Sequence, residues 1–325
     1  MFGRDLKNEN INIMNLPYGN IKPKEKPHLI AKKKANLPHY TLLCKSEQKE
    51  NLNPQYVTEY STMIFEDLKK NETINVADYS SLFNCQEEIT EAHRKALIEW
   101  LYAVYDKFNL LPETLYLTIN IIDRYIEKKP IEVKKFQLVG VVAMFIASKY
   151  EEIYAPEIRD FVMITNNTLK REDILKMEYS IMRTLNFELY TISPFVFLNR
   201  FHFVSGDSKK STLYLARYVL DICLLDVNFC KYKSSVKAAS VLFLARKMLK
   251  IDESNTWNNE LKMHSHLDLK DLKDCAKEAL RYLNKNLNEL NGTAMYKKYY
   301  SYDFNYISKI FDIATCNLNS NKKYN

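Results

Sequence analysis

The sequence has few turn-forming residues and lacks any apolar stretch long enough to cross a membrane. Its 325 residues include 5 glycines and 9 prolines, which disfavours an all-β protein with many tight turns. The longest apolar run, 138–147, is shorter than the roughly 20 residues of a membrane-spanning helix. The N-terminal stretch MFGRDLKNEN lacks the apolar core of a secretory signal peptide. We therefore expect an intracellular, mainly helical protein without a membrane segment.

The sequence also lacks the motifs that mark catalytic and metal sites. None of its 6 cysteines belongs to a CxxC pair, so we interpret them as reduced thiols rather than as a disulfide frame or a zinc site. It contains no glycine-rich phosphate loop, no nucleophile elbow and no cluster of metal ligands. These absences predict a non-catalytic protein without a metal or a cofactor.

Positive charge is concentrated at the N-terminus. Residues 1–40 hold eight Lys or Arg and three Asp or Glu, a net charge of +5. Because the whole chain carries +7, the remainder carries only +2. A body so close to neutral argues against a nucleic-acid partner.

The segment 138–157, LVGVVAMFIASKYEEIYAPE, is the strongest structural signal in the chain. Its first ten residues are all apolar or small. A helix that is apolar all round lies in a core. The apolar run then ends in Ser148, Lys149 and Tyr150, and Pro156 prevents the helix from continuing. We predict a core helix that brings charge to the surface at one point.

Helical periodicity recurs along most of the chain in two blocks of similar order. Residues 1–53 are expected to form a disordered arm and 313–325 a tail, because they show little apolar periodicity. The expected helices of the first block are 97–108, 115–126, 136–151, 156–163 and 169–185. Those of the second block are 194–203, 211–225, 234–249 and 268–290, with a loop around Trp257. This arrangement predicts an all-α fold made of two duplicated helical units.

A separate helix is expected before the first block, over 54–70. Tyr56, Tyr60, Ile64 and Leu68 recur every four residues and form one narrow apolar stripe. Such an apolar stripe needs an apolar surface to pack against. The protein's own domain and a partner protein are the two alternatives.

Four charged residues lie beside apolar helical faces. Glu178 interrupts the stripe of the 169–185 helix, and Lys149 ends the core helix. The two could pair with each other, or they could bind the free backbone groups of a partner's helix, with lysine at its carbonyls and glutamate at its amides. The residues alone favour the internal pair. Arg94 and Asp123 are predicted to form a second intramolecular salt bridge.

Several segments together resemble the cyclin family, and within it the mitotic A/B type, nearer to B. The resemblance covers about residues 55–310. It is carried by the segments RKALIEWL (94–101), NIIDRY (120–125), QLVG (137–140), AMFIASKYEEIY (143–154), ME (177–178), LNF (185–187), LARY (215–218), LD (225–226) and YKKY (296–299).

The resemblance implies a fold of two tandem five-helix cyclin boxes, 87–190 and 191–312, preceded by an N-terminal helix, 54–70. It also implies a regulatory subunit, in nucleus and cytoplasm, that binds and activates a cyclin-dependent kinase at the G2/M transition. A transcription-type cyclin and a two-box DNA-binding transcription initiation factor are the alternatives. The near-neutral body and the lack of a CxxC pair weigh against the second.

The same resemblance assigns residues to the kinase interface. In the family, the residues at the positions of Lys149 and Glu178 contact the kinase backbone around its C helix, which reverses the preference for an internal pair. The residue at the position of Phe187 packs against that helix. The N-terminal helix lies on the kinase through the positions of Tyr60, Ile64 and Leu68.

The family's hydrophobic patch, which docks Arg-x-Leu peptides of kinase substrates, is only partly present. Three of its positions match the family: Leu97, Trp100 and Gln137. Three others depart from it, with His93, Ala96 and Ala103 in place of a Met, an Ile and an acidic residue. We expect substrate docking to be weakened or altered.

The tripeptide Lys49-Glu50-Asn51 resembles a KEN box, the degron that the anaphase-promoting ubiquitin ligase recognises. It lies in the expected disordered arm, where a degron is accessible. This resemblance adds that ligase to the expected partners.

Overall fold

The computed structural model describes residues 60–251 and 256–311. All of them belong to the larger of the chain's two compact units, Tyr40–Asn325. The expected arm, 1–53, its Lys49-Glu50-Asn51 tripeptide and the expected tail, 313–325, lie outside the described residues.

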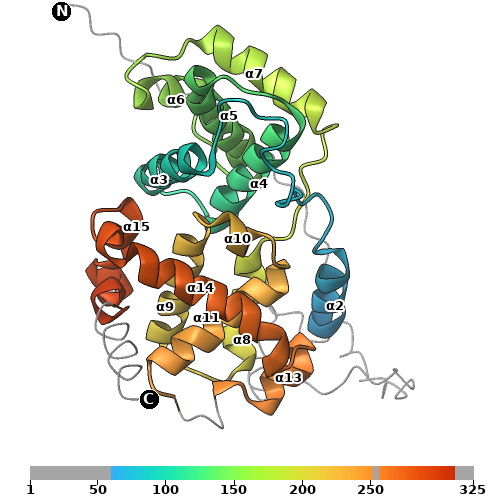
Figure 1. Cartoon of the computed structure of the whole chain (residues 1–325), viewed down its shortest axis with the longest axis vertical. Helices are drawn as coiled ribbons and strands as arrows, with labels where there is room; N and C mark the ends of the chain where they lie inside the picture. Colours follow the sequence, from blue (N-terminus) through green and yellow to red (C-terminus); the bar gives the residue numbers. More distant parts are fainter. Residues whose placement is uncertain (1–59, 252–255, 312–325) are drawn as a thin grey trace, which may run out of the picture. The chain divides into compact units, whose positions relative to one another are not determined.

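The described residues form helices, turns and loops, without a β-strand (Figure 1). The helix α2 (Ser61–Asn71) precedes two blocks. The first block consists of α3 (Glu91–Lys107), α4 (Pro112–Lys128), α5 (Val133–Glu151), α6 (Ile158–Ile164) and α7 (Arg171–Thr184). The second consists of α8 (Pro194–Val204), α9 (Lys210–Cys223), α10 (Val227–Cys230), α11 (Ser234–Met248), α13 (Asn259–Ser265), α14 (Leu269–Leu290), α15 (Ala294–Tyr299) and a 3-10 turn, η2 (Tyr302–Phe304). The predicted all-α fold with two helical blocks is confirmed.

α5 is the central helix of the first block, since it contacts α3, α4, α6 and α7. Its residues 139–148 are all buried, and Lys149 is the first exposed residue after them. A Cβ atom at Gly140 would come within 2.8 Å of the Leu97 side chain on α3, so glycine permits a close approach of these two helices. The apolar run therefore lies in the core, as predicted.

α11 has the same role in the second block, where it contacts α8, α9 and α14. Small side chains again allow close packing, since Ala238, Ala239 and Ala245 are fully buried. Each block is thus built around one helix rich in small apolar residues. This supports the prediction of two duplicated units.

Trp257 lies in a turn, as predicted, but the prediction did not include the short helix α13, which begins two residues later. The Asn258 side chain accepts a 2.9 Å hydrogen bond from the backbone N–H of Leu261 and caps this short helix. The indole Nε1 of Trp257 donates to the Leu267 carbonyl at 3.0 Å, and Trp257 is buried. A composition rich in Lys and Asn indicated a loop, but one side-chain cap and one buried ring are sufficient for a short helix.

Two buried polar clusters join the blocks. Arg94 on α3 donates through Nη1 to the carbonyl of Leu224 at the end of α9, at 2.9 Å. Asp221 on α9 accepts hydrogen bonds from three tyrosine hydroxyls of three other helices, Tyr102, Tyr116 and Tyr299, at 2.7–2.8 Å. Both clusters are shielded from water, so the blocks hold each other through paired polar groups.

Candidate partner-binding surface

Lys149 and Glu178 form an ion pair between the end of α5 and the middle of α7. The ammonium of Lys149 also lies 4.2 Å from the ring centroid of Phe145, one helical turn earlier. The Lys149 side chain is 43% exposed and that of Glu178 is 20% exposed. Both partners of the pair are therefore accessible to another molecule.

Exposed apolar side chains belong to the same two helices and to the loop that follows α5. Ile153 and Tyr154 in that loop are 90% and 93% exposed, and Tyr150 and Tyr179 are also exposed. Tyr150 directly follows Lys149 in the chain and Tyr179 directly follows Glu178, so an exposed ring accompanies each member of the ion pair. We call Lys149, Glu178 and these four residues the α5–α7 surface.

The sequence reasoning did not assign Ile153 and Tyr154 to a site. Two apolar residues between the acidic end of a core helix and Pro156 were the available signal. The neighbouring Glu152 fixes this loop, because its Oε1 accepts hydrogen bonds from the Leu111 backbone N–H at 2.7 Å and from the Thr114 hydroxyl. The loop is thus held against the start of α4 while its apolar side chains face outward.

Phe187 lies just beyond the end of α7, in an unusual backbone conformation. The N–H of Phe187 bonds to the Met182 carbonyl at 2.9 Å, and that of Asn186 bonds to the Arg183 carbonyl at 3.2 Å. This is the Schellman arrangement that ends many helices. Asn186 and Phe187 have φ angles of 53° and 60°. Asparagine tolerates this region, but a bulky side chain there is strained.

The side chain of Phe187 is 67% exposed, so burial within this chain does not compensate for the strain. The residues after it are fixed from α4, where Arg124 donates to the Glu188 carbonyl at 2.7 Å. Asn75 adds a hydrogen bond to the Tyr190 carbonyl at 3.0 Å. The chain therefore holds an exposed phenylalanine in a defined position, which is typical of a binding residue.

The apolar stripe predicted on the N-terminal helix is divided between two environments. Tyr60, just before α2, and Ile64 are exposed, whereas Leu68 is partly buried against the core. Phe65 adds to the inner face, 6.5 Å from the ring of Phe197 on α8. The inner part of the helix therefore packs on the protein's own second block, and a partner for the exposed part stays a prediction.

Polar contacts fix the C-terminal end of α2 on the second block. The Glu72 carboxylate accepts from the backbone N–H of Ser235 at 2.7 Å and from its hydroxyl at 3.0 Å, at the start of α11. Lys69 donates to the carbonyl of Ser265 and, at 3.4 Å, to that of His266. An acid at a helix start and a cation at a helix end are the favourable arrangement for the helix dipole.

The structure contains the Arg94–Asp123 ion pair that the sequence suggested. Two nitrogens of Arg94 donate to the two carboxylate oxygens at 2.7 and 2.8 Å, and both side chains are fully buried. Tyr79 donates a third hydrogen bond to Asp123 at 3.0 Å. Because the pair is inaccessible, its role is structural.

The three residues matched to the hydrophobic patch differ in exposure. Leu97 is buried against α5, Trp100 is half-buried and Gln137 is exposed. His93, where the family has a methionine, accepts the backbone N–H of Thr90 through Nδ1 at 3.2 Å and completes the capping box of α3. This side chain thus folds back to the helix start and leaves the patch smaller.

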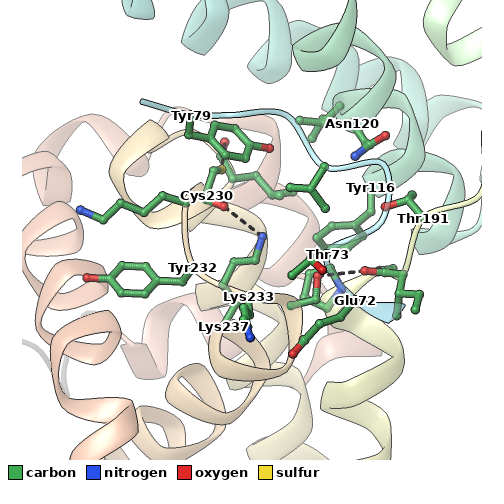
Figure 2. Close-up of a pocket in the computed structure, with 18 residues that line it drawn as sticks. Glu72, Thr73, Tyr79, Tyr116, Asn120, Thr191, Cys230, Tyr232, Lys233 and Lys237 are labelled. Atoms are coloured by element: carbon green, nitrogen blue, oxygen red, sulfur yellow. Dashed lines mark hydrogen bonds between the residues drawn. The ribbon is translucent and has the colours of Figure 1, made fainter. Parts of the chain in front are cut away.

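A cavity of about 180 Å³ is lined by the segment 72–79 that follows α2, by α4, by the linker 191–194 and by the start of α11. Figure 2 shows Tyr116 and Asn120 of α4 and Lys233 and Lys237 around it. None of the residues predicted to bind a partner lines this cavity. Among residues 60–251 and 256–311, no group of His, Cys, Asp and Glu side chains is arranged to hold a metal, and no helix has the length and hydropathy of a membrane span.

Two family models match the chain, one for each helical block. The cyclin N-terminal domain matches residues 63–190, and the cyclin C-terminal domain matches residues 192–312. Two solved structures are similar in fold: a viral cyclin from herpesvirus saimiri and the yeast RNA Pol II CTD kinase complex CTDK-1. The viral cyclin has a TM-score of 0.58 at 19% identity and covers 66% of this chain and 97% of its own. The kinase complex has a TM-score of 0.52 at 14% identity, with coverage of 70% and 73%.

Curated relatives include mitotic cyclins of both types. Cyclin-A2-1 of Oryza sativa subsp. japonica is 37% identical over 266 residues, which are 80% of this chain and 54% of that protein. A G2/mitotic-specific cyclin-B of Spisula solidissima is 39% identical over 259 residues, 79% of this chain and 59% of that protein. The chain spans a little over half the length of these relatives. Because the identities are similar, they do not separate the A type from the B type.

Proposed function

Because the chain belongs to the cyclin family, we propose that it is a non-catalytic subunit that binds and activates a cyclin-dependent kinase. The α5–α7 surface carries this proposal. An accessible ion pair, Lys149–Glu178, is bordered there by large exposed apolar side chains. Such a combination fits a partner helix that has free backbone groups at its ends.

The kinase C helix is the proposed partner element. Lys149 would donate to the carbonyls at one end of the bound backbone, and Glu178 would accept from amides. Each can do so only by giving up part of the internal pair, which costs little because exposed ion pairs contribute about 0–1 kcal/mol. Phe187 would pack against the same helix, and its strained, exposed conformation supports that role.

The N-terminal helix would extend this interface. Tyr60 and Ile64 are exposed in the free chain and are proposed to lie on the kinase. Leu68, also matched to the family's contact positions, packs partly against the core, so we propose that it supports the helix beneath the contact. Ile153 and Tyr154 join the proposed interface because they are the most exposed of its apolar residues.

Activation would follow from preferential binding to one state of the kinase. An active kinase needs its β3 lysine paired with the glutamate of the C helix, and this pairing depends on where that helix sits. Raising the active population from about 1% to about 99% requires about 5.5 kcal/mol of differential affinity. Signalling interfaces above roughly 2,000 Å² are large enough to supply such a difference.

Finer assignments follow the resemblance to mitotic cyclins. We propose a B-type cyclin that acts at the G2/M transition, in nucleus and cytoplasm, and is degraded through the tripeptide Lys49-Glu50-Asn51. Docking of Arg-x-Leu substrates would be weakened, because His93 serves a helix cap and Leu97 is buried.

Co-purification followed by a histone-kinase assay tests the proposed function. The full chain should retain a cyclin-dependent kinase and raise its histone phosphorylation well above that of the kinase alone. Retention without activation, or no retention, would contradict the proposal.

A further inference from the structure

A groove with a volume of about 310 Å³ lies between α3 and α14, away from the residues proposed to contact a kinase. We call it the α3–α14 groove. Its walls include Ala92 on α3, Leu225 and Asp226 just before α10, and Tyr282 and Lys285 on α14. No residue assigned to the kinase interface or to the hydrophobic patch lines it.

Asp226 is a buried carboxylate that is only half satisfied. Its Oδ1 accepts the backbone N–H of Asn228 at 3.0 Å and caps α10. Its Oδ2 is buried and has no hydrogen-bond partner among the described residues, and Asp226 as a whole is 7% exposed. Burial is the main cause that raises the pKa of Asp226. A carboxylate in this position is costly unless a donor neutralises it.

A second unsatisfied group lines the same groove. The hydroxyl of Tyr282 is buried and has no hydrogen-bond partner in the described chain. Its neighbour Asn286 is engaged elsewhere: its amide nitrogen donates to the Tyr282 carbonyl at 2.8 Å, and its oxygen accepts from Lys95 at 3.4 Å. Two buried polar atoms of residues that line this groove therefore have no hydrogen-bond partner among the described residues, whereas most buried polar groups are paired.

Two of the three cations that line the groove are paired elsewhere, although Arg281 still lowers the pKa of Asp226. Lys95 pairs with Glu289 at 2.8 Å, and Arg281 pairs with Glu278. Lys285 also lines the groove but leaves the Asp226 oxygen without a partner. The Oδ2 atom of Asp226 therefore remains an open hydrogen-bond acceptor in this groove.

We propose that the α3–α14 groove binds an arginine or lysine side chain of a partner polypeptide. The cationic head would donate to Asp226 Oδ2 and to the Tyr282 hydroxyl, while the aliphatic stem would lie along Leu225 and the tyrosine ring. The groove is large enough for one long side chain but not for a helix. Arginine fits best, because its several donors can reach two acceptors at once.

An NMR titration of the full chain with two matched probes tests this proposal. The probes are N-acetyl-arginine N-methylamide and its citrulline analogue, which has a similar shape and no charge. We expect the arginine probe to bind about tenfold more tightly, as a charge-assisted hydrogen bond would provide. In Asp226→Asn the ratio should fall to about one, whereas asparagine still caps α10. Tyr282→Phe, which keeps the ring, should lower the ratio without abolishing it.

Asp274→Asn, an exposed carboxylate on α14 that pairs with Lys277, is the control and should leave the ratio unchanged. The proposal is overturned if citrulline binds as tightly as arginine, if neither probe binds the unmodified chain, or if Asp226→Asn keeps the preference. Kinase retention by Asp226→Asn should be unchanged. The test of arginine binding in the groove and the test of kinase binding can therefore give different outcomes.

Discussion

The hydroxyl of Tyr102 on the first block donates a 2.8 Å hydrogen bond to the carboxylate of Asp221 on the second. Tyr116 and Tyr299 donate to the same carboxylate, and all four residues are buried. One acid thus collects hydrogen bonds from three other helices. The relative position of the two blocks depends on this cluster.

Tyr102→Phe should destabilise the protein by about 1–3 kcal/mol, because it leaves a buried carboxylate with one donor fewer. Tyr105→Phe is the matched control. That ring is also buried and packs edge-on against Tyr102, with the ring centroids 5.2 Å apart. Its hydroxyl is not among the three that donate to Asp221, so its loss should matter less. Urea unfolding of both variants measures the difference. Equal losses of unfolding free energy in the two variants would show that ring packing, and not the hydrogen bond to Asp221, causes the destabilisation.

The buried ion pair between Arg94 and Asp123 should behave as a coupled unit. Asp123→Ala leaves an unpaired buried guanidinium and should cost about 3–5 kcal/mol of stability. The double variant Arg94→Ala with Asp123→Ala should cost less than the sum of the single changes. Denaturant unfolding of the two single variants and the double variant gives the interaction free energy between Arg94 and Asp123. If the losses of unfolding free energy simply add, the two residues do not act as a pair.

Stability should fall at alkaline pH. Burial raises the pKa of the Cys275 thiol from 9.0 to about 12, and burial likewise raises the pKa values of Tyr102, Tyr116 and Tyr299. The unfolded chain loses the thiol proton above about pH 9, while the folded chain keeps it until about pH 12. The stabilisation is therefore complete below pH 9 and is lost as pH rises to 12.

Unfolding by urea at pH 8, 9, 10 and 11 checks the direction of this pH dependence. The urea concentration at the unfolding midpoint should decrease with each step in pH above 9. Cys275→Ala, although less well packed, should show a shallower fall because one of the titrating groups is gone. A midpoint that stays constant up to pH 11 would rule out this explanation.

The strained backbone of Phe187 predicts opposite effects on stability and binding. Phe187→Gly should leave stability unchanged or raise it by up to about 1 kcal/mol, since glycine adopts a positive φ without strain. It should weaken kinase binding, because the exposed ring is lost. Asn186→Gly, the neighbour with a similar φ, should leave binding intact. Phe187→Gly that binds the kinase as tightly as the unmodified chain would remove Phe187 from the interface.

The sequence predicts those parts of the fold that depend on long, regular patterns. The core helix was expected over 136–151 and is observed as α5, Val133–Glu151, because its apolar run allows no other interpretation. Its first turn was missed because Val133, Lys134 and Lys135 carry no apolar periodicity. The end was correct, since Pro156 and the acidic residues before it stop the helix.

The Arg94–Asp123 pair was predicted, but most other features that depend on residues far apart in the chain were not. The three tyrosines around Asp221 lie up to 119 positions from it, and no local pattern reveals that they converge. The strained φ of Phe187 and the unpaired oxygen of Asp226 are likewise properties of the folded chain. Lys149 and Glu178 lie 29 positions apart, and the sequence indicates them only because Glu178 interrupts an apolar stripe and Lys149 ends an apolar run.

The affinity of the chain for the proposed partner, a cyclin-dependent kinase, tests the central claim most directly. Lys149→Ala with Glu178→Ala should weaken binding at least about tenfold, since truncating interfacial charges that make hydrogen bonds typically costs 2 kcal/mol or more. The control is Lys277→Ala with Asp274→Ala, an exposed pair on α14, which should bind as the unmodified chain does. Surface plasmon resonance on immobilised kinase gives all three dissociation constants. An unchanged constant for the Lys149 and Glu178 double variant, with activation intact, would contradict the account.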